Sequence, residues 1–120
     1  MDILIIVGRI LLGGFFVKNG LSHFQKMEAM TGYVSSKGLS QPKMAVIISG
    51  LMLLIGGLGI IFWVYVELSV FLLTVFLLAT SFKMHAFWKE TDPMCRMSEN
   101  INFYKNLAIL GGVLLALGLI

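Results

Sequence analysis

The chain has 120 residues, of which 58% are hydrophobic and 12% are charged, and its mean hydropathy is +0.95. These values lie outside the usual range of soluble domains and indicate an integral membrane protein. The formal net charge is +3, but the basic residues stand beside the apolar segments, which argues against nucleic-acid binding. The single cysteine, Cys95, excludes an internal disulfide, and no paired-cysteine zinc spacing is present.

The first apolar segment, residues 3–21, is expected to be a retained membrane span. A signal peptide is the alternative, but the segment lacks a basic start and a small-residue cleavage site, and Arg9 interrupts it. One face of such a helix would carry a charge, two glycines that permit close helix approach, and a histidine. The residues of this face are Arg9, Gly13, Phe16, Gly20 and His23.

Residues 22–43 are more polar and form the first loop, in which a short interfacial helix is expected around residues 24–34. Beyond the loop, Glu67 is the only formal charge between Met44 and Phe82. As one helix this stretch would reach roughly 58 Å, about twice the ~30 Å hydrocarbon core of a bilayer. It therefore predicts two spans, residues 44–61 and 66–84, joined by an interfacial turn at Trp63 and Tyr65.

The third span carries a polar stripe, because four residues recur at helical spacing: Glu67, Thr74, Ser81 and His85. The charged segment from Lys89 to Asn100 is broken by Pro93, and we expect a solvent-exposed loop in which Asp92, Arg96 and Glu99 make local pairs. The last span covers residues 103–120. It contains a small-residue ladder, Ala108, Gly112 and Ala116, that would suit a homo-oligomer contact.

The sequence thus predicts an all-α fold, a four-helix integral membrane bundle formed by a single domain of residues 1–120. A weak internal similarity at an offset of 62 residues, which pairs His23 with His85, suggests two parallel helical-hairpin repeats. Lys and Arg flank the first and third loops but are absent from the second turn and the chain ends. This bias predicts that the two longer loops face the cytoplasm and both termini face outward.

Several segments resemble the DoxX family of small bacterial membrane proteins, and the resemblance covers essentially the whole chain. The matching elements are Arg9, GLSHF (20–24), SGLMLLIGG (49–57), His85 with Phe87 and Trp88, Asp92 with Pro93, and Phe103, Lys105 and Asn106. The resemblance implies a four-helix fold in the bacterial cytoplasmic (inner) membrane. It also implies similarity to a subunit of a thiosulfate:quinone oxidoreductase, although other members have no known activity.

The chain departs from the family pattern at one position. Many members carry a glutamate shortly before the glycine pair of the second span, where this chain has only Val46, Ile47 and Ile48. The role of that glutamate therefore cannot be transferred to this sequence.

Two constellations are candidates for function. Arg9 and Glu67 are expected at similar depth near the outer side, where an intramembrane ion pair would reduce the cost of burying each charge. At the cytoplasmic end, spans deliver His23, His85, Trp88 and Lys105, which are the predicted ligand-binding residues. Interfacial histidines bonded to backbone carbonyls and a Trp88 in the aromatic belt are the structural alternatives.

These residues leave two classes of function open. The favoured class is a small subunit or accessory of a membrane redox system that interacts with quinone, because histidine exchanges protons near neutral pH. Haem is less favoured, since two histidines are few ligands, and no metal site, nucleotide motif or catalytic residue is indicated. The alternative is a non-enzymatic binding, assembly or permeation protein for a lipid, a small solute or a partner helix.

Overall fold

The computed structural model describes residues 2–120 as a bundle of helices. In chain order these are α1 (Ile3–Gln25), α2 (Met27–Ser36), α3 (Pro42–Phe62), α4 (Val66–Lys83), the short 3₁₀ helix η1 (Phe87–Lys89) and α5 (Pro93–Leu117). Four segments are long and apolar enough to cross a membrane: α1, α3, α4 continued through η1, and α5. The predicted all-α fold with four candidate spans is confirmed, and α2 is a short helix in the first loop, where one is expected.

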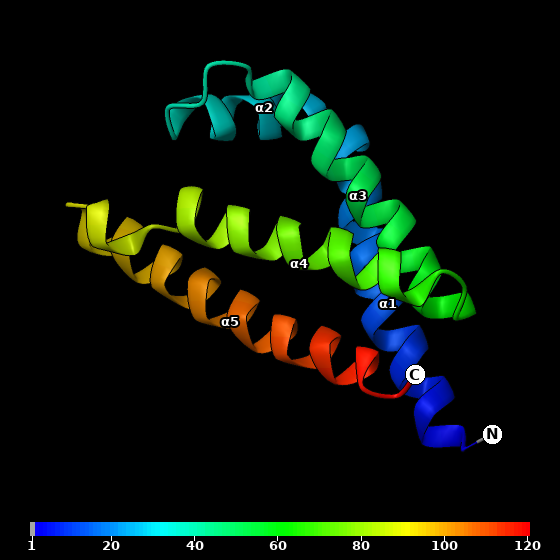
Figure 1. Ribbon diagram of the computed structural model, residues 1–120. Coiled ribbons are helices and arrows are strands. Elements are labelled where there is room, and N and C mark those ends of the chain that lie inside the picture. The colour runs from blue at the N-terminus through cyan, green and yellow to red at the C-terminus, as the bar shows by residue number, and fades with distance from the viewer. Residues whose placement is uncertain (1) are drawn as a thin grey trace.

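Two helix pairs make up the bundle (Figure 1). In the first, α1 runs along α3, and α2 lies at the end where these two helices are connected. In the second, α4 runs beside α5. The two pairs are joined by the tight turn between α3 and α4, whereas at the other end α2 and α3 diverge from α4.

The contact between α1 and α3 is close because glycines face each other. A Cβ atom on Gly13 would lie 2.6 Å from the carbonyl oxygen of Gly57, and one on Gly57 would lie 2.7 Å from that of Gly13. One heptad further, a Cβ on Gly20 would lie 3.0 Å from the carbonyl oxygen of Gly50. The predicted face of α1 is thus confirmed for Gly13, Phe16 and Gly20, which are all buried.

A small apolar core fills the space between the pairs. Its buried members come from all four spans: Phe16, Leu53, Ile60, Val66, Val70, Leu73, Leu77 and Val113. The outward faces are also apolar, as shown by Leu4 (74% exposed), Phe71 (62%) and Leu115 (76%). Such a surface would be costly in water and is suited to lipid tails, in agreement with an integral membrane protein.

The fourth span begins earlier than the sequence analysis expects. Helix α5 starts at Pro93, so the prediction of a loop as far as Asn100 is wrong from Pro93 onward, although residues 93–98 are exposed. The Asp92 carboxylate accepts a hydrogen bond of 3.2 Å from the backbone N–H of Cys95 and caps the helix. Pro93 occupies the first turn, where its missing N–H has no cost.

The small-residue ladder of α5 faces the protein along most of its length. Ala116 is buried, and a Cβ on Gly112 would lie 3.9 Å from a methyl carbon of Leu12 in α1. Only Ala108 is exposed. A homo-oligomer that uses this ladder stays a prediction, and only its Ala108 end is open to a second copy.

The neighbouring glycines Gly13 and Gly14 provide a matched test of the α1–α3 contact. We expect Gly13→Ala to lower the free energy of unfolding by about 1–3 kcal/mol, because its Cβ has no room beside Gly57. Gly14→Ala should be neutral or slightly stabilising, since no atom lies within 4 Å of its Cβ position. Unfolding in detergent micelles measures both, and equal effects of the two changes would contradict the close contact.

Candidate functional site

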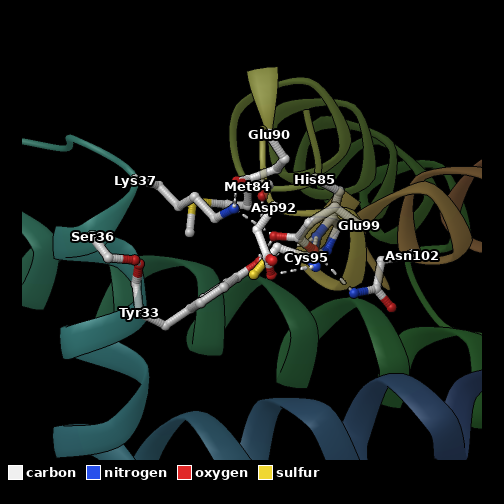
Figure 2. A network of polar contacts seen from close by, with 10 residues as sticks. All are labelled: Tyr33, Ser36, Lys37, Met84, His85, Glu90, Asp92, Cys95, Glu99 and Asn102. Carbon is white, nitrogen blue, oxygen red and sulfur yellow. Dashed lines mark hydrogen bonds and ion pairs between the residues drawn. The ribbon is translucent and has the colours of Figure 1, made fainter. Parts of the chain in front are cut away.

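A buried carboxylate organises the polar groups at the end of the bundle near α2. Glu99 of α5 is only 5% exposed, and four side chains point toward it (Figure 2). Tyr33 donates a hydrogen bond of 2.7 Å to Glu99 Oε2, and Lys37 Nζ lies 2.5 Å from the same oxygen. His85 Nδ1 lies 2.9 Å from Oε1, and Asn102 donates a hydrogen bond of 3.1 Å to Oε1.

Three parts of the chain supply these groups. Tyr33 and Lys37 are four residues apart, so they project from one side of α2 and its C-terminal end. His85 lies two residues beyond the end of α4, and Asn102 stands one turn beyond Glu99 in α5. Lys37 also donates a hydrogen bond of 2.7 Å to Glu90, which follows η1. We call these six residues the Glu99 cluster: Tyr33, Lys37, His85, Glu90, Glu99 and Asn102.

The cluster keeps its lysine charged. Burial by itself would lower the pKa of Lys37, but its hydrogen bonds to Glu90 and Glu99 outweigh this effect and raise the pKa. A buried carboxylate that lost its partners would be an uncompensated charge, and breaking such a pair typically costs about 3–5 kcal/mol. The Lys37 ammonium therefore compensates Glu99 across the space between α2 and α5.

Tyr33 is held as a hydrogen-bond donor. Its ring is partly exposed, but its hydroxyl lies 3.3 Å from the carbonyl oxygen of Met84 and 3.3 Å from His85 Nδ1, in addition to its bond to Glu99. Burial of the hydroxyl raises the pKa of Tyr33, and the hydrogen bond to the negative Glu99 raises it further. The phenol therefore stays protonated at neutral pH.

His85 has one nitrogen engaged and one available. Its Nδ1 atom is paired with Glu99, and within residues 2–120 its Nε2 atom makes no hydrogen bond. A carboxylate on one ring nitrogen selects the tautomer and orients the ring, which leaves the other nitrogen to accept or release a proton.

The cluster borders a hollow of about 630 Å³ that is open to the outside. Residues of α2 form one wall, and His85, Glu90 and the start of α5 form the other. The lining residues are Tyr33, Ser36, Lys37, His85, Glu90, Cys95, Ser98, Glu99 and Asn102. Across residues 2–120, no group of three or more His, Cys, Asp and Glu side chains is arranged to hold a metal ion.

The four predicted ligand-binding residues take different positions in the structure. Only His85 belongs to the Glu99 cluster. His23 lies near the end of α1, where its Nδ1 atom is 2.7 Å from the carbonyl oxygen of Asn19 and its ring contacts Phe76. Among the described residues no hydrogen bond or ring contact joins His23 to His85.

Trp88 and Lys105 lie near the same end of α4 and α5. Trp88 is 45% exposed, and its ring centroid lies 5.4 Å from that of Phe103 and 5.2 Å from that of Phe87. Lys105 is exposed on α5. These positions give an aromatic group with a basic neighbour, as at a membrane interface.

At the opposite end, Arg9 closes the last turn of α3. Its guanidinium donates hydrogen bonds of 2.8 and 3.2 Å to the carbonyl oxygen of Ile61 and lies 5.5 Å from the centre of the Trp63 ring. Glu67 is exposed and borders a second hollow together with Trp63. The ion pair between Arg9 and Glu67 stays a prediction, which a double-mutant cycle of the two residues would measure.

The polar stripe of α4 turns inward along its middle. Ser81 is fully buried, and its hydroxyl and that of Thr74 have no hydrogen-bond partner among the described residues. Glu67 lies in the first turn of α4 and His85 just beyond its end, and the buried core residues Leu73 and Leu77 stand beside the middle of the stripe.

Sequence reasoning missed Glu99, which it assigned to a solvated loop. The structure corrects this, because Glu99, Phe103 and Asn106 are all buried along one face of α5. A signal was present: once the helix begins at the Asp92 cap, these residues recur at spacings of four and three. Tyr33 and Lys37 had no comparable signal, since their partners lie more than fifty positions away in the chain.

The fold and the site define a four-span helical membrane protein with a polar cluster at one end. The sequence model of the DoxX family matches residues 4–86, which is more than half of the chain. The chain belongs to the DoxX family. No curated protein and no solved structure matches it significantly. The family match includes His85 but ends before α5, so Glu99 lies outside it.

The Tyr33 hydroxyl provides a test of the cluster. We expect Tyr33 to ionise above the ordinary tyrosine pKa of about 10, because its hydroxyl is buried and bonded to Glu99. A phenolate absorbance titration of the wild type minus that of Tyr33→Phe isolates this residue. Glu99→Gln should move the transition to lower pH, although not fully to the ordinary value, since burial persists.

The sign of the effect on stability follows from the raised pKa. Above pH ~10 the unfolded chain loses the Tyr33 proton before the folded one does. The stability that Tyr33 contributes is therefore present below this pH and is lost as the pH rises through the folded-state pKa. Ionisation of Tyr33 in the ordinary range would show that its hydroxyl is not part of the cluster.

Proposed function

We propose that this DoxX family protein is a small subunit or accessory of a membrane redox system, and that a quinone exchanges protons with the Glu99 cluster. The observation that carries the proposal is the pairing of His85 Nδ1 with Glu99 at 2.9 Å, which leaves Nε2 available beside the hollow. A histidine oriented by a carboxylate is an effective general acid and base near neutral pH.

A quinone supplies carbonyl oxygens that take up two protons when a redox partner delivers two electrons. The chain supplies the groups that move those protons. When His85 is neutral, Nε2 accepts a proton, and the nearby Glu99 carboxylate stabilises the imidazolium that results. When His85 is protonated, Nε2 donates. Tyr33 and Lys37 hold Glu99 in place during both steps.

The other predicted ligand residues would act at the edge of this site. Trp88, beside Phe87 and Phe103, offers an aromatic surface on which a planar ring can stack. Lys105 would add a positive charge at the same end of the bundle. His23 is the exception, because it lies near the end of α1 with its Nδ1 atom at the carbonyl of Asn19 and its ring against Phe76, and it is not bonded to the Glu99 cluster.

A second, non-enzymatic function is favoured by a different observation. The groups of the Glu99 cluster largely satisfy one another, because Glu99 alone has four partners. Polar networks of this kind also serve purely structural ends. In that case the protein binds a lipid, a small solute or a partner helix and takes no part in electron transfer.

Replacing His85 distinguishes these functions. We expect purified wild-type protein in lipid nanodiscs to retain added quinone, and the affinity of His85→Gln for quinone to be at least ten times lower, because the ring nitrogen that would exchange protons with the quinone, Nε2, is removed. His23→Gln is the matched control and should lose less than threefold. Quinone retention is measured by extraction and chromatography. Equal binding by His85→Gln and wild type would remove the support for the redox function and favour the second one.

The orientation in the membrane is also a proposal. We infer that the Glu99 cluster faces the cytoplasm of a bacterial inner membrane, because both Lys- and Arg-rich loops lie at this end of the bundle. The only cysteine, Cys95, is exposed at the same end.

Cys95 therefore reports the orientation without any engineered residue. A membrane-impermeant maleimide should leave Cys95 unlabelled in intact spheroplasts and label it after permeabilisation. Cysteines placed at Asp2 or Ile120, in a Cys95→Ser background, should show the reverse. Rapid labelling of Cys95 in intact spheroplasts would invert the proposed topology.

A further inference from the structure

We propose that α2 is a strap over the hollow that can rotate about its two ends. The contacts of Glu99 with Tyr33 and Lys37, which we call the latch, keep this strap closed. The strap would control access to His85. Its role as a gate rests on the proposed function of that site, whereas the latch itself does not depend on the identity of the ligand.

The strap is weakly held by its own packing. Helix α2 has ten residues and none of them is buried, in contrast to α1, α3, α4 and α5. It packs mainly on the start of α3. Segments with few buried apolar contacts are those that open first in a folded protein.

Both ends of α2 are breaks in the helical chain. At its start, Lys26 leaves helical geometry, with φ −116° and ψ 41°, between α1 and α2. At its end, Gly38 has φ +88°, a conformation that residues with a Cβ rarely adopt. A short helix such as α2 between two such points can rotate as a unit, since only a few backbone angles at its ends need to change.

The contacts that hold the strap across the hollow come from two residues. Within residues 2–120, every hydrogen bond and ion pair between the strap and the α4–α5 end involves Tyr33 or Lys37. Both residues reach Glu99, and Lys37 also reaches Glu90. In Figure 2 their side chains extend from α2 toward α5, with Glu99 at the meeting point.

Loss of the Glu99 contacts with Tyr33 and Lys37 would change the structure only around the hollow. Tyr33, Ser36 and Lys37 form the α2 wall of the hollow, so a displaced strap would widen it on that side. The paired contacts of α1 with α3 and of α4 with α5 do not include these residues. The bundle would therefore stay intact while His85 Nε2 became more accessible from the α2 side.

Hydrogen exchange of the full-length protein in nanodiscs tests the latch. We expect Glu99→Gln and Lys37→Gln to speed exchange of the amides of residues 27–36 by about tenfold or more, because each loses hydrogen bonds to a charged group. The amides of α1 and α3 should exchange as in the wild type. Glu28→Gln is the matched control, since it removes a carboxylate from the exposed first turn of the strap.

Two variants are needed because one of them could destabilise the whole protein. Glu99 is buried, so Glu99→Gln can loosen the whole bundle, whereas Lys37 lies at the edge and Lys37→Gln decides in that case. The proposal is overturned if Lys37→Gln leaves the α2 amides within twofold of the wild type. It is also overturned if α1 and α3 exchange faster by the same factor as α2.

A chemical probe separates the latch from the redox function. The chain has only two histidines, and diethyl pyrocarbonate should modify His85 several times faster in Lys37→Gln than in the wild type, with His23 unchanged. An unchanged rate at His85 contradicts the gate. A faster rate in a protein that binds no quinone supports the gate and rejects the proposed quinone site.

Discussion

The bundle depends on the close approach of α1 to α3, in which the backbone of each helix occupies the space that a Cβ of the other would need. Lipid tails solvate leucine as well as another helix does, so apolar side chains alone do little to hold membrane helices together. Glycines change this balance, because they let two backbones make dispersion contacts along a whole face. The pairs Gly13 with Gly57 and Gly20 with Gly50 make this face, and α4 then packs on α3 with Leu73 seated against Gly56.

The other end of the molecule is held by a different force. There, within residues 2–120, the hydrogen bonds and ion pairs between the strap and the α4–α5 end come from Tyr33 and Lys37, and the buried carboxylate of Glu99 contacts both. The ion pairs and hydrogen bonds of Glu99 depend on the distance between the strap and α5, whereas the glycine contacts hold the backbones of α1 and α3 directly against each other. The protein therefore combines a tightly packed α1–α3 pair with a strap whose polar contacts across the hollow are a few hydrogen bonds and ion pairs.

This division also connects structure with the proposed function. Glu99 pairs with His85, the residue to which the proposed function assigns proton exchange, and it also bonds Tyr33 and Lys37 of the strap. A change in the charge of His85 would consequently alter the contacts of Glu99 with Tyr33 and Lys37. The family match ends at residue 86, before α5. The Glu99 carboxylate thus lies outside the residues that the family model matches.

The sequence by itself determined the membrane class, the four apolar helices, the inward face of α1 and a short helix in the first loop, because hydropathy and helical periodicity are local properties of the chain. Asp92 followed by Pro93 is also a sequence signal for the start of α5. A helix that begins there has Glu99 and Phe103 on one face, and that face is buried. Tertiary structure alone decided that Lys37 and Tyr33 reach Glu99, and that Arg9 bonds the Ile61 carbonyl. These partners depend on the depth and rotation of each helix relative to its neighbours. Both are set by the sum of many packing contacts, and no single segment of sequence contains that sum.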